Sequence, residues 1–302
     1  MKTPIHLLVT VSILLLMKLE CYAQASTTTD RLSVKIATGF GDERLHWTIA
    51  GNSQGKNPNI LSELHWKNVR GPLLDIGVSA KIKQRFLLKL STKYQKTVSG
   101  TVTDTDYQGD DRTNQSFFFK ANADNGFIFA FDAQIGYHFN ISDRISLAPL
   151  VGFTRDQADL KLLDDESFGD QKLNSSYETI WKGMIVSLVT RFAISDRFEI
   201  APIFSYRQLR YNAVADWNLI DEFQHPTSFK HYAKGFGIRS VLEVSYDISR
   251  NVCLLLQPQY EFSETGHGTD TVFFKNGQIE NTRLNGVDRK SFSILIGTTI
   301  NF

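Results

Sequence analysis

The stretch ISDRISLAP at residues 141–149 returns as ISDRFEIAP at residues 194–202. A looser copy, ISRNVCLLL, begins at residue 248, so that the copies are spaced by 53 and 54 residues. Each copy opens with a short polar cluster of the kind that forms turns, and a weaker cluster lies at residues 81–85, about one repeat earlier. Four short turns divide the chain into five hairpins, so the repeat predicts about ten antiparallel strands.

The segments between these turns alternate between apolar and polar residues, which is the pattern of a β-strand with one apolar face. Residues 127–139 carry only apolar side chains at odd positions, whereas the even positions include Asp132, Gln134 and His138. Half a repeat leaves roughly 20 residues for each strand, far more than the about 5–6 residues that are usual in a soluble β-sandwich. A membrane-crossing strand needs only about 9–11 residues. Because polar residues fill one face, we expect the apolar face to meet lipid.

Long polar connections near residues 51–58, 104–114, 163–174, 216–228 and 264–285 alternate with the short turns. The sequence therefore predicts an all-β fold, a transmembrane antiparallel up-and-down β-barrel with long extracellular loops and short periplasmic turns. Pro149, Pro202 and Pro258 fall inside predicted strands, where we expect bulges because proline lacks a ladder donor. The last strand alternates up to Phe302, and such an aromatic end resembles the signature that the barrel-assembly machinery reads.

Residues 1–25 have the features of a secretory signal peptide. Lys2 precedes an apolar run at residues 7–17, and AQA at residues 23–25 is a small-residue cleavage site. The run is shorter than the about 20 residues of a membrane-spanning helix. Cleavage would leave residues 26–302 as the barrel, with Cys253 as its one cysteine and hence no internal disulfide. We expect this barrel in the bacterial outer membrane, surrounded by lipid and lipopolysaccharide.

Charge and composition argue against several other functions. The 33 basic and 32 acidic residues are balanced, and no basic patch predicts nucleic-acid binding. The mature chain has no His-x-x-x-His, His-x-His or cysteine pair, so neither a metal site nor a cofactor is expected. Ten strands leave a narrow lumen. We expect the inward charges to pair across it and function to lie at the rim rather than in a pore; these charges are Asp132, Arg191, Arg239, Glu243 and Glu261.

Candidate chemistry lies in the second long connection, which opens with Asp104, Thr105 and Asp106. Alternate residues of a strand share a face, so both carboxylates would point one way. Two close carboxylates tend to share a proton and can hold a water as general base. The alternative is a solvated acidic loop, which is common in secreted proteins.

The chain resembles the omptin family of ten-stranded outer-membrane proteases. The resemblance rests on Leu32-Ser33, ERL at residues 43–45, SELHWK at residues 62–67, DTDY at residues 104–107 and the aromatic C-terminus. It implies that Asp104 and Asp106 form one catalytic pair that activates water without a covalent intermediate. It also implies a possible dependence on lipopolysaccharide, as in the family.

The second catalytic pair of the family matches only in part. DEFQHP at residues 221–226 corresponds to an omptin Asp-Glu-His-x-Asp-Pro, so Asp221 matches the family aspartate but Phe223 occupies the histidine position. We expect His225, two residues further on, to be the substitute base. Glu43 matches an acidic residue that holds a basic substrate side chain, whereas Leu219 stands in place of its acidic partner.

Two functions follow from these residues. The matching Asp104, Asp106, Asp221 and Glu43 favour an aspartic-type endopeptidase that cleaves extracellular polypeptides. Phe223 and Leu219 favour a non-catalytic barrel that binds a protein as an adhesin or has a structural role. A narrow channel is a third hypothesis.

Overall fold

The computed structural model describes residues 31–83, 85–163 and 173–302. The predicted signal peptide at residues 1–25 and most of the predicted loop at residues 163–174 lie outside these ranges. The chain forms the following elements: β1 (Arg31–Ile49), β2 (Ser62–Ile82), β3 (Phe86–Lys96), β4 (Ser99–Gly109), the 3-10 helix η1 (Asp110–Arg112), β5 (Thr113–Asn122), β6 (Gly126–Tyr137), β7 (Phe139–Ser142), β8 (Ile145–Leu162), β9 (Ser175–Ala193), β10 (Phe198–Asp216), β11 (Phe229–Asp247), β12 (Val252–Thr265), β13 (Gly268–Phe273) and β14 (Ile279–Asn301).

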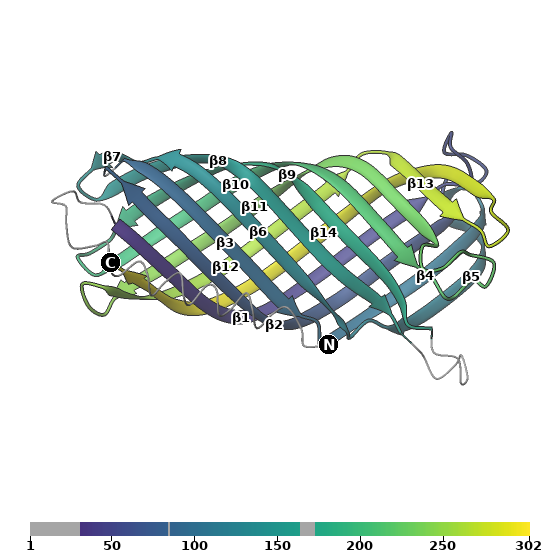
Figure 1. The fold of residues 1–302 in the computed structure, drawn as a ribbon, viewed down its shortest axis with the longest axis horizontal. Helices are drawn as coiled ribbons and strands as arrows, with labels where there is room; N and C mark the ends of the chain where they lie inside the picture. The colour runs from purple at the N-terminus through teal and green to yellow at the C-terminus, as the bar shows by residue number, and fades with distance from the viewer. Residues whose placement is uncertain (1–30, 84, 164–172) are drawn as a thin grey trace.

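In the described part of the chain these elements build ten long strands of one barrel, as the repeat predicted (Figure 1). Three of the ten strands are interrupted: β3 continues as β4, β5 as β6 and β7, and β12 as β13. A bulge on β2, between Lys67 and Arg70, faces the break between β3 and β4. All four predicted short turns are present, and they lie between Ile82 and Phe86, Ser142 and Ile145, Ala193 and Phe198, and Asp247 and Val252.

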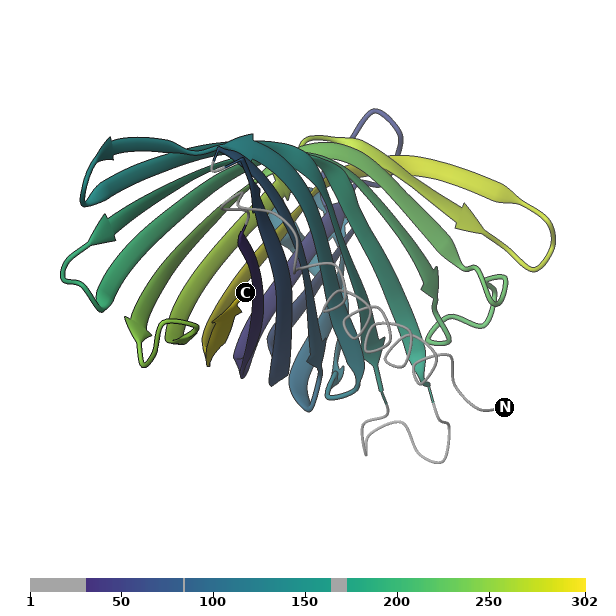
Figure 2. The same ribbon diagram turned by 60° about the vertical axis from the view of Figure 1, so that its left-hand side comes forward.

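The barrel closes because the first described strand pairs with the last. β1 pairs with β14 from Ser33 opposite Asn301 to Ile49 opposite Leu284, and its other edge pairs with β2. Figure 2 shows β1, in purple, beside the end of β14, in yellow. Closure matters in a membrane because an open sheet edge would leave its backbone polar groups unpaired in hydrocarbon.

The predicted bulges at the three prolines are wrong. The pairing register is the same on both sides of Pro149, Pro202 and Pro258. At each proline, two successive residue pairs are missing from the pairing with one neighbouring strand, and the pairing then continues in the same register. A missing N–H removes a bond to one side only, so the strand absorbs the proline without inserting a residue.

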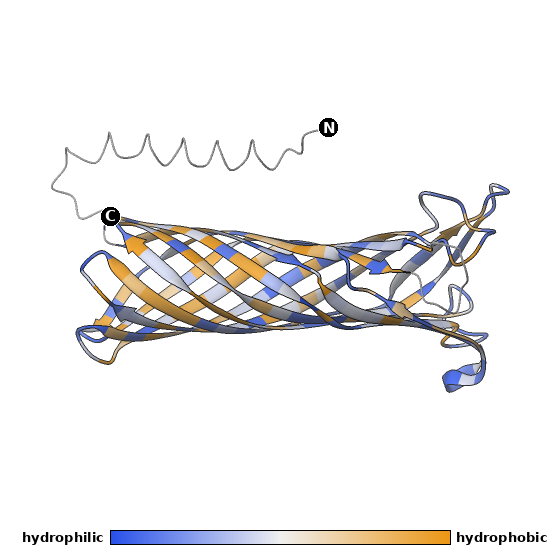
Figure 3. Cartoon of the chain, turned by 90° about the horizontal axis from the view of Figure 1, so that it is seen from below, coloured by the Kyte–Doolittle hydropathy of each residue, from blue (hydrophilic) through white to orange (hydrophobic). Residues whose placement is uncertain are grey.

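The outer wall carries the apolar face of the strands, as predicted. Figure 3 shows apolar and polar residues alternating along the wall. Exposed apolar side chains form a band, here called the belt, that includes Ile36, Phe40, Leu74, Ile76, Leu88, Leu90, Phe131, Ile135, Val151, Phe153, Met184, Val186, Leu188, Phe204, Leu242, Leu254, Leu256, Phe292, Ile294 and Ile296. Among the described residues no helix is long and apolar enough to cross a membrane.

Inside the barrel a buried charge layer lies near the middle of the strands. It contains four acidic and four basic side chains, namely Glu43, Asp132, Asp156, Glu261, Lys93, Arg207, Arg239 and Arg289. Arg239 pairs with Asp132 and Glu261, so the predicted pairing across the lumen is confirmed for these three residues. Arg191 pairs instead with Glu199, eight residues along the chain.

Beyond the charge layer, toward the end with the longer loops, aromatic side chains fill the barrel. This aromatic plug consists of Trp47, Trp66, Tyr177, Trp181, Tyr211, Trp217 and Phe229. Trp66 stacks on Tyr177 with ring centroids 5.1 Å apart, and the Tyr177 and Tyr211 hydroxyls are 2.5 Å apart. All four tryptophans of the chain are therefore inside. Alternation in the sequence shows that a strand has an apolar face, but it does not show whether that face points into the barrel or toward lipid.

Candidate functional site

The predicted carboxylate pair lies at the long-loop end of β4, past the belt. Asp104 faces Leu64 of β2, and Asp106 faces Ser62 in the same ladder. Asp104 is 5% exposed and Asp106 is half-buried. The Ser62 hydroxyl donates to Asp104 Oδ1 at 3.4 Å and also interacts with Asp106. The two carboxylates thus share one face and one hydroxyl, as the spacing predicted.

Both carboxyl groups hold their protons more tightly than free aspartic acid does. Burial and the neighbouring Asp106 charge raise the pKa of Asp104 well above its ordinary value, against hydrogen bonds from Ser62 and Trp217. Burial also raises the pKa of Asp106. A neutral acid beside a carboxylate is the arrangement that shares a proton between two groups.

These pKa shifts predict a pH-dependent stability. A carboxyl whose folded-state pKa is raised stabilises the fold most below the unfolded pKa, near 4, and this contribution is lost as pH rises through the folded pKa. Asp104→Asn removes the titration, so the variant should gain stability relative to the wild type as pH rises from 4 to 9. Urea unfolding in detergent micelles across this range measures the difference. Asp221→Asn, at an exposed site, is the control; an equal gain there would contradict the assignment.

The loop between β10 and β11 does not assemble the second pair as predicted. Asp221 is exposed, and among the described residues no hydrogen bond or ion pair joins it to His225. His225 Nδ1 is instead 2.7 Å from Asp216 Oδ1, at the end of β10. Asp216 lies between Ala215 and Trp217, which point inside, so strand alternation directs Asp216 outward.

Phe223, at the family's histidine position, belongs to an aromatic contact at the mouth of the barrel. Its backbone bridges to Phe274, and its ring lies 5.6 Å from Phe274 and 6.5 Å from Phe229. Leu219 also packs against the core. Phe223 and Leu219, which both differ from the omptin pattern, are therefore apolar side chains in packing contacts.

Glu43, the predicted substrate-binding residue, is 2% exposed in the charge layer. Arg289 Nη2 donates to Glu43 Oε2 at 2.7 Å, and Arg289 Nη1 donates to Asp156 at 2.8 Å. The chain itself thus supplies the basic partner that the resemblance assigned to a substrate.

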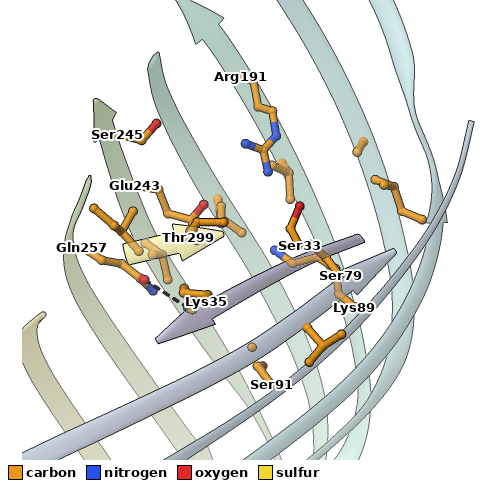
Figure 4. A pocket seen from close by; sticks show the side chains of 18 of the residues that line it. Ser33, Lys35, Ser79, Lys89, Ser91, Arg191, Glu243, Ser245, Gln257 and Thr299 are labelled. Atoms are coloured by element: carbon orange, nitrogen blue, oxygen red, sulfur yellow. Dashed lines mark hydrogen bonds between the residues drawn. The ribbon is translucent and has the colours of Figure 1, made fainter. Parts of the chain in front are cut away.

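A cavity of about 710 Å³ occupies the lumen on the other side of the charge layer, toward the short turns. Figure 4 shows Lys35, Lys89, Arg191 and Glu243 among its lining residues, and Lys35 bonds to Gln257 at 3.1 Å. Along β10 the inward residues run from Ser205 at the cavity through Arg207 to Tyr211 of the plug. Arg207 and Tyr211 are fully buried, so the lumen is interrupted between its two ends.

A closed antiparallel barrel with an apolar belt, a charged interior and one end of short turns defines an outer-membrane β-barrel protein. The chain belongs to the Protochlamydia outer membrane protein family, Pom, whose model matches residues 35–302. This assignment supports the predicted location in the bacterial outer membrane. No curated protein matches the sequence.

Similar solved structures are outer-membrane barrels. The crystal structure of the outer membrane protease OmpT from Escherichia coli matches with a TM-score of 0.70 and 13% identity, over 93% of this chain and 99% of that one. The translocator domain of the autotransporter NalP from Neisseria meningitidis matches with a TM-score of 0.41 and 12% identity, over 97% and 95% of the two chains. The resemblance to omptins is confirmed for the fold, and at 13% identity it shows the fold alone.

Two features of the mouth were not predicted. The Asp216–His225 contact depends on how the loop folds back on β10, and residue spacing does not encode that fold. Trp217, which interacts with Asp104, follows the last residue of β10 and continues the inward series of Ala213 and Ala215. Because alternate residues share a face, extending the series from Ala215 to Trp217 would have predicted that Trp217 points inside.

Proposed function

We propose that this barrel is an omptin-like endopeptidase whose long-loop end faces out of the cell and cleaves polypeptides there. The observation that carries the proposal is the cluster of Asp104, Asp106 and Ser62 at the mouth. The pair lies on one strand face, both pKa values are raised, and a shared hydroxyl links the two groups.

In the proposed reaction the more buried Asp104 stays protonated and donates to the peptide carbonyl oxygen. Asp106, the more accessible group, accepts a proton from water, and the water oxygen attacks the carbonyl carbon. The C–N bond then breaks as the leaving nitrogen takes a proton from the pair. His225, oriented by Asp216 instead of Asp221, is the candidate for an assisting base from the loop.

The outer wall and the residues at the long-loop end also indicate the partners of the proposed endopeptidase. Lipid and lipopolysaccharide cover the belt, and lipopolysaccharide is included in the assay because the omptin resemblance implies it. The barrel-assembly machinery would act on the strand that ends at Phe302. Because Arg289 already pairs with Glu43, we expect no strong preference for a basic side chain at that position.

The test is cleavage of a mixed peptide library by the refolded barrel with lipopolysaccharide, read by mass spectrometry. Asp104→Asn and Asp106→Asn should each lower the cleavage rate by about 10²–10⁴-fold, the usual contribution of a general acid or base. His225→Ala decides whether that residue assists. Asp221→Asn, exposed on the same loop, is the matched control and should retain activity.

The second candidate is a non-catalytic surface barrel that binds a protein partner at the same end. The specific observation in its favour is Phe223, which is packed against Phe274 where the family has its histidine. A folded barrel that cleaves no peptide in the library would contradict the endopeptidase and leave this binding function as the conclusion.

A further inference from the structure

Four polar side chains gather on the outer wall of the barrel, past the belt and at the level of the mouth. They are His46 on β1, Glu63 and His65 on β2, and Asp288 on β14. Their chain neighbours Leu45, Trp47, Leu64 and Trp66 belong to the interior core, so alternation turns the four outward. The cluster is therefore separate from the Asp104 and Asp106 pair, which lies inside the wall.

A repeated tripeptide places the two histidines side by side. Leu-His-Trp occurs at residues 45–47 and again at residues 64–66. The antiparallel register pairs the copies in opposite directions, with His46 directly across from His65. The two rings are stacked with centroids 3.9 Å apart and an angle of 8° between their planes. Searching for spacings within one strand misses this pair because each strand contributes one histidine.

The ring nitrogens converge on one carboxylate. His46 Nε2 lies 3.3 Å from Glu63 Oε2, and His65 Nε2 lies 3.6 Å from Glu63 Oε1. Suitable donor atoms of the three residues all lie within 4.8 Å of one another. Two nitrogens and one carboxylate oxygen form a donor set that suits Zn²⁺ and related transition-metal ions.

Asp288 orients the first histidine. His46 Nδ1 is 2.7 Å from Asp288 Oδ2, and an ionised carboxylate can only accept, so the proton is on Nδ1. A neutral His46 ring then directs the lone pair of Nε2 at the Glu63 oxygen. Two electron-rich atoms 3.3 Å apart need a cation between them, either a proton on the ring or a metal ion. A carboxylate that holds the far nitrogen is the usual support of a metal-bound histidine.

The protonation states also suit a metal. Burial would raise the pKa of Glu63, but the hydrogen bond and charge of Arg112 lower it to about 2, so the carboxylate is ionised at neutral pH. Burial lowers the pKa of His65, which favours the neutral form of that ring. Metal binding requires an ionised carboxylate and neutral imidazoles.

We propose that His46, Glu63 and His65 bind a divalent transition-metal ion such as Zn²⁺ on the outer wall, with Asp288 positioning His46 and water completing the coordination. Bonds of about 2.0–2.2 Å require the donor atoms to close in from their present separations. An ion lies in the plane of each imidazole that it binds, so binding also turns the two rings out of their parallel stack.

Arg112 competes with the ion for Glu63. Its Nε and Nη2 atoms lie 2.9 and 2.5 Å from Glu63 Oε2, and its side chain is 47% exposed. Arg112 extends from η1, where its φ of +63° and the φ of +56° at Asp111 are left-handed. An exposed arginine can swing away into water, so the site opens when Arg112 releases the carboxylate.

The test is a titration of the refolded barrel in detergent micelles with Co²⁺, followed by visible absorption and by displacement with Zn²⁺. We expect one ion per chain, with affinity falling as pH drops through about 6.5, where histidine protonates. His46→Ala and Glu63→Gln should each weaken binding by at least about 10-fold, and Asp288→Asn by about 10–100-fold. Arg112→Gln should tighten binding because it removes the competing cation.

His267→Ala is the matched control, because His267 is an exposed histidine whose Nδ1 bonds to the Asn285 carbonyl at 2.9 Å. Equal binding by the wild type, His46→Ala and Glu63→Gln would overturn the proposal, as would weaker binding by Arg112→Gln. Tighter binding by Arg112→Gln cannot result from misfolding, so the test does not depend on the loss variants alone. Peptide cleavage is not measured, so the outcome is independent of the proposed endopeptidase.

Discussion

Asp156→Ala is expected to lower the free energy of unfolding by about 3–5 kcal/mol, the cost of leaving buried charges without their partner. Asp156 Oδ2 accepts from Arg207 at 2.6 Å and from Arg289 at 2.8 Å, and Arg239 lies 3.8 Å from Oδ1. The charge layer balances four acids against four bases, so removing Asp156 leaves a net positive charge out of contact with water.

Urea unfolding in micelles, with the mature barrel folded beforehand, measures this loss. Asp159→Ala is the matched control, because Asp159 is on the same strand but is partly exposed and pairs with the partly exposed Lys161 at 2.9 Å. That pair should contribute no more than about 1 kcal/mol. Equal losses at Asp156 and Asp159 would show that the layer does not depend on its charge balance. Asp156→Asn keeps the shape and isolates the charge.

Trp66→Ala is expected to cost about 3–5 kcal/mol, the range for truncating a buried aromatic residue. Trp66 is 1% exposed, stacks on Tyr177 and meets Trp217 edge-on at 6.5 Å. Its indole N–H donates to the Lys161 carbonyl at 3.1 Å, so the side chain also ties β2 to β8 across the lumen. Trp66→Phe keeps a ring and loses the bond, and it should cost less than alanine.

The comparison is Phe118→Ala, because Phe118 is 55% exposed on the outer face of β5 at the same end of the barrel. A surface change of this kind should stay within about 0.5 kcal/mol. If truncating Phe118 cost as much as truncating Trp66, the interior plug would not be the source of stability at this end.

The repeated turns and the strand alternation predicted the architecture because both are local signals. A turn cluster every 53 or 54 residues fixes the hairpin length, and period-two alternation fixes which side chains leave the wall. What lies inside depends on which strands face each other across the lumen. Trp66 and Tyr177 are 111 positions apart and meet only after closure, so no local pattern predicts the plug.

The candidate site likewise has one part that the sequence predicts and one part that depends on the folded loop. Asp104 and Asp106 share a strand, and their proximity follows from period two. The partner of His225 depends on the path of a twelve-residue loop, residues 217–228, and the sequence offered Asp221 where the structure has Asp216. The two Leu-His-Trp copies lie on neighbouring strands, and the register of β1 and β2 places their histidines opposite each other.

The length of the strands has a mechanical consequence. On β14 the belt ends near Phe292, and the strand continues to Ile279 at the tip of the β13–β14 hairpin. At about 3.3 Å per residue and a tilt of about 40°, that stretch rises roughly 30 Å above the lipid. The loops are therefore carried by the paired strands of a barrel whose interior is filled with side chains, and not by a flexible linker. A polypeptide bound at these loops would therefore be held at a nearly constant distance from the lipid headgroups.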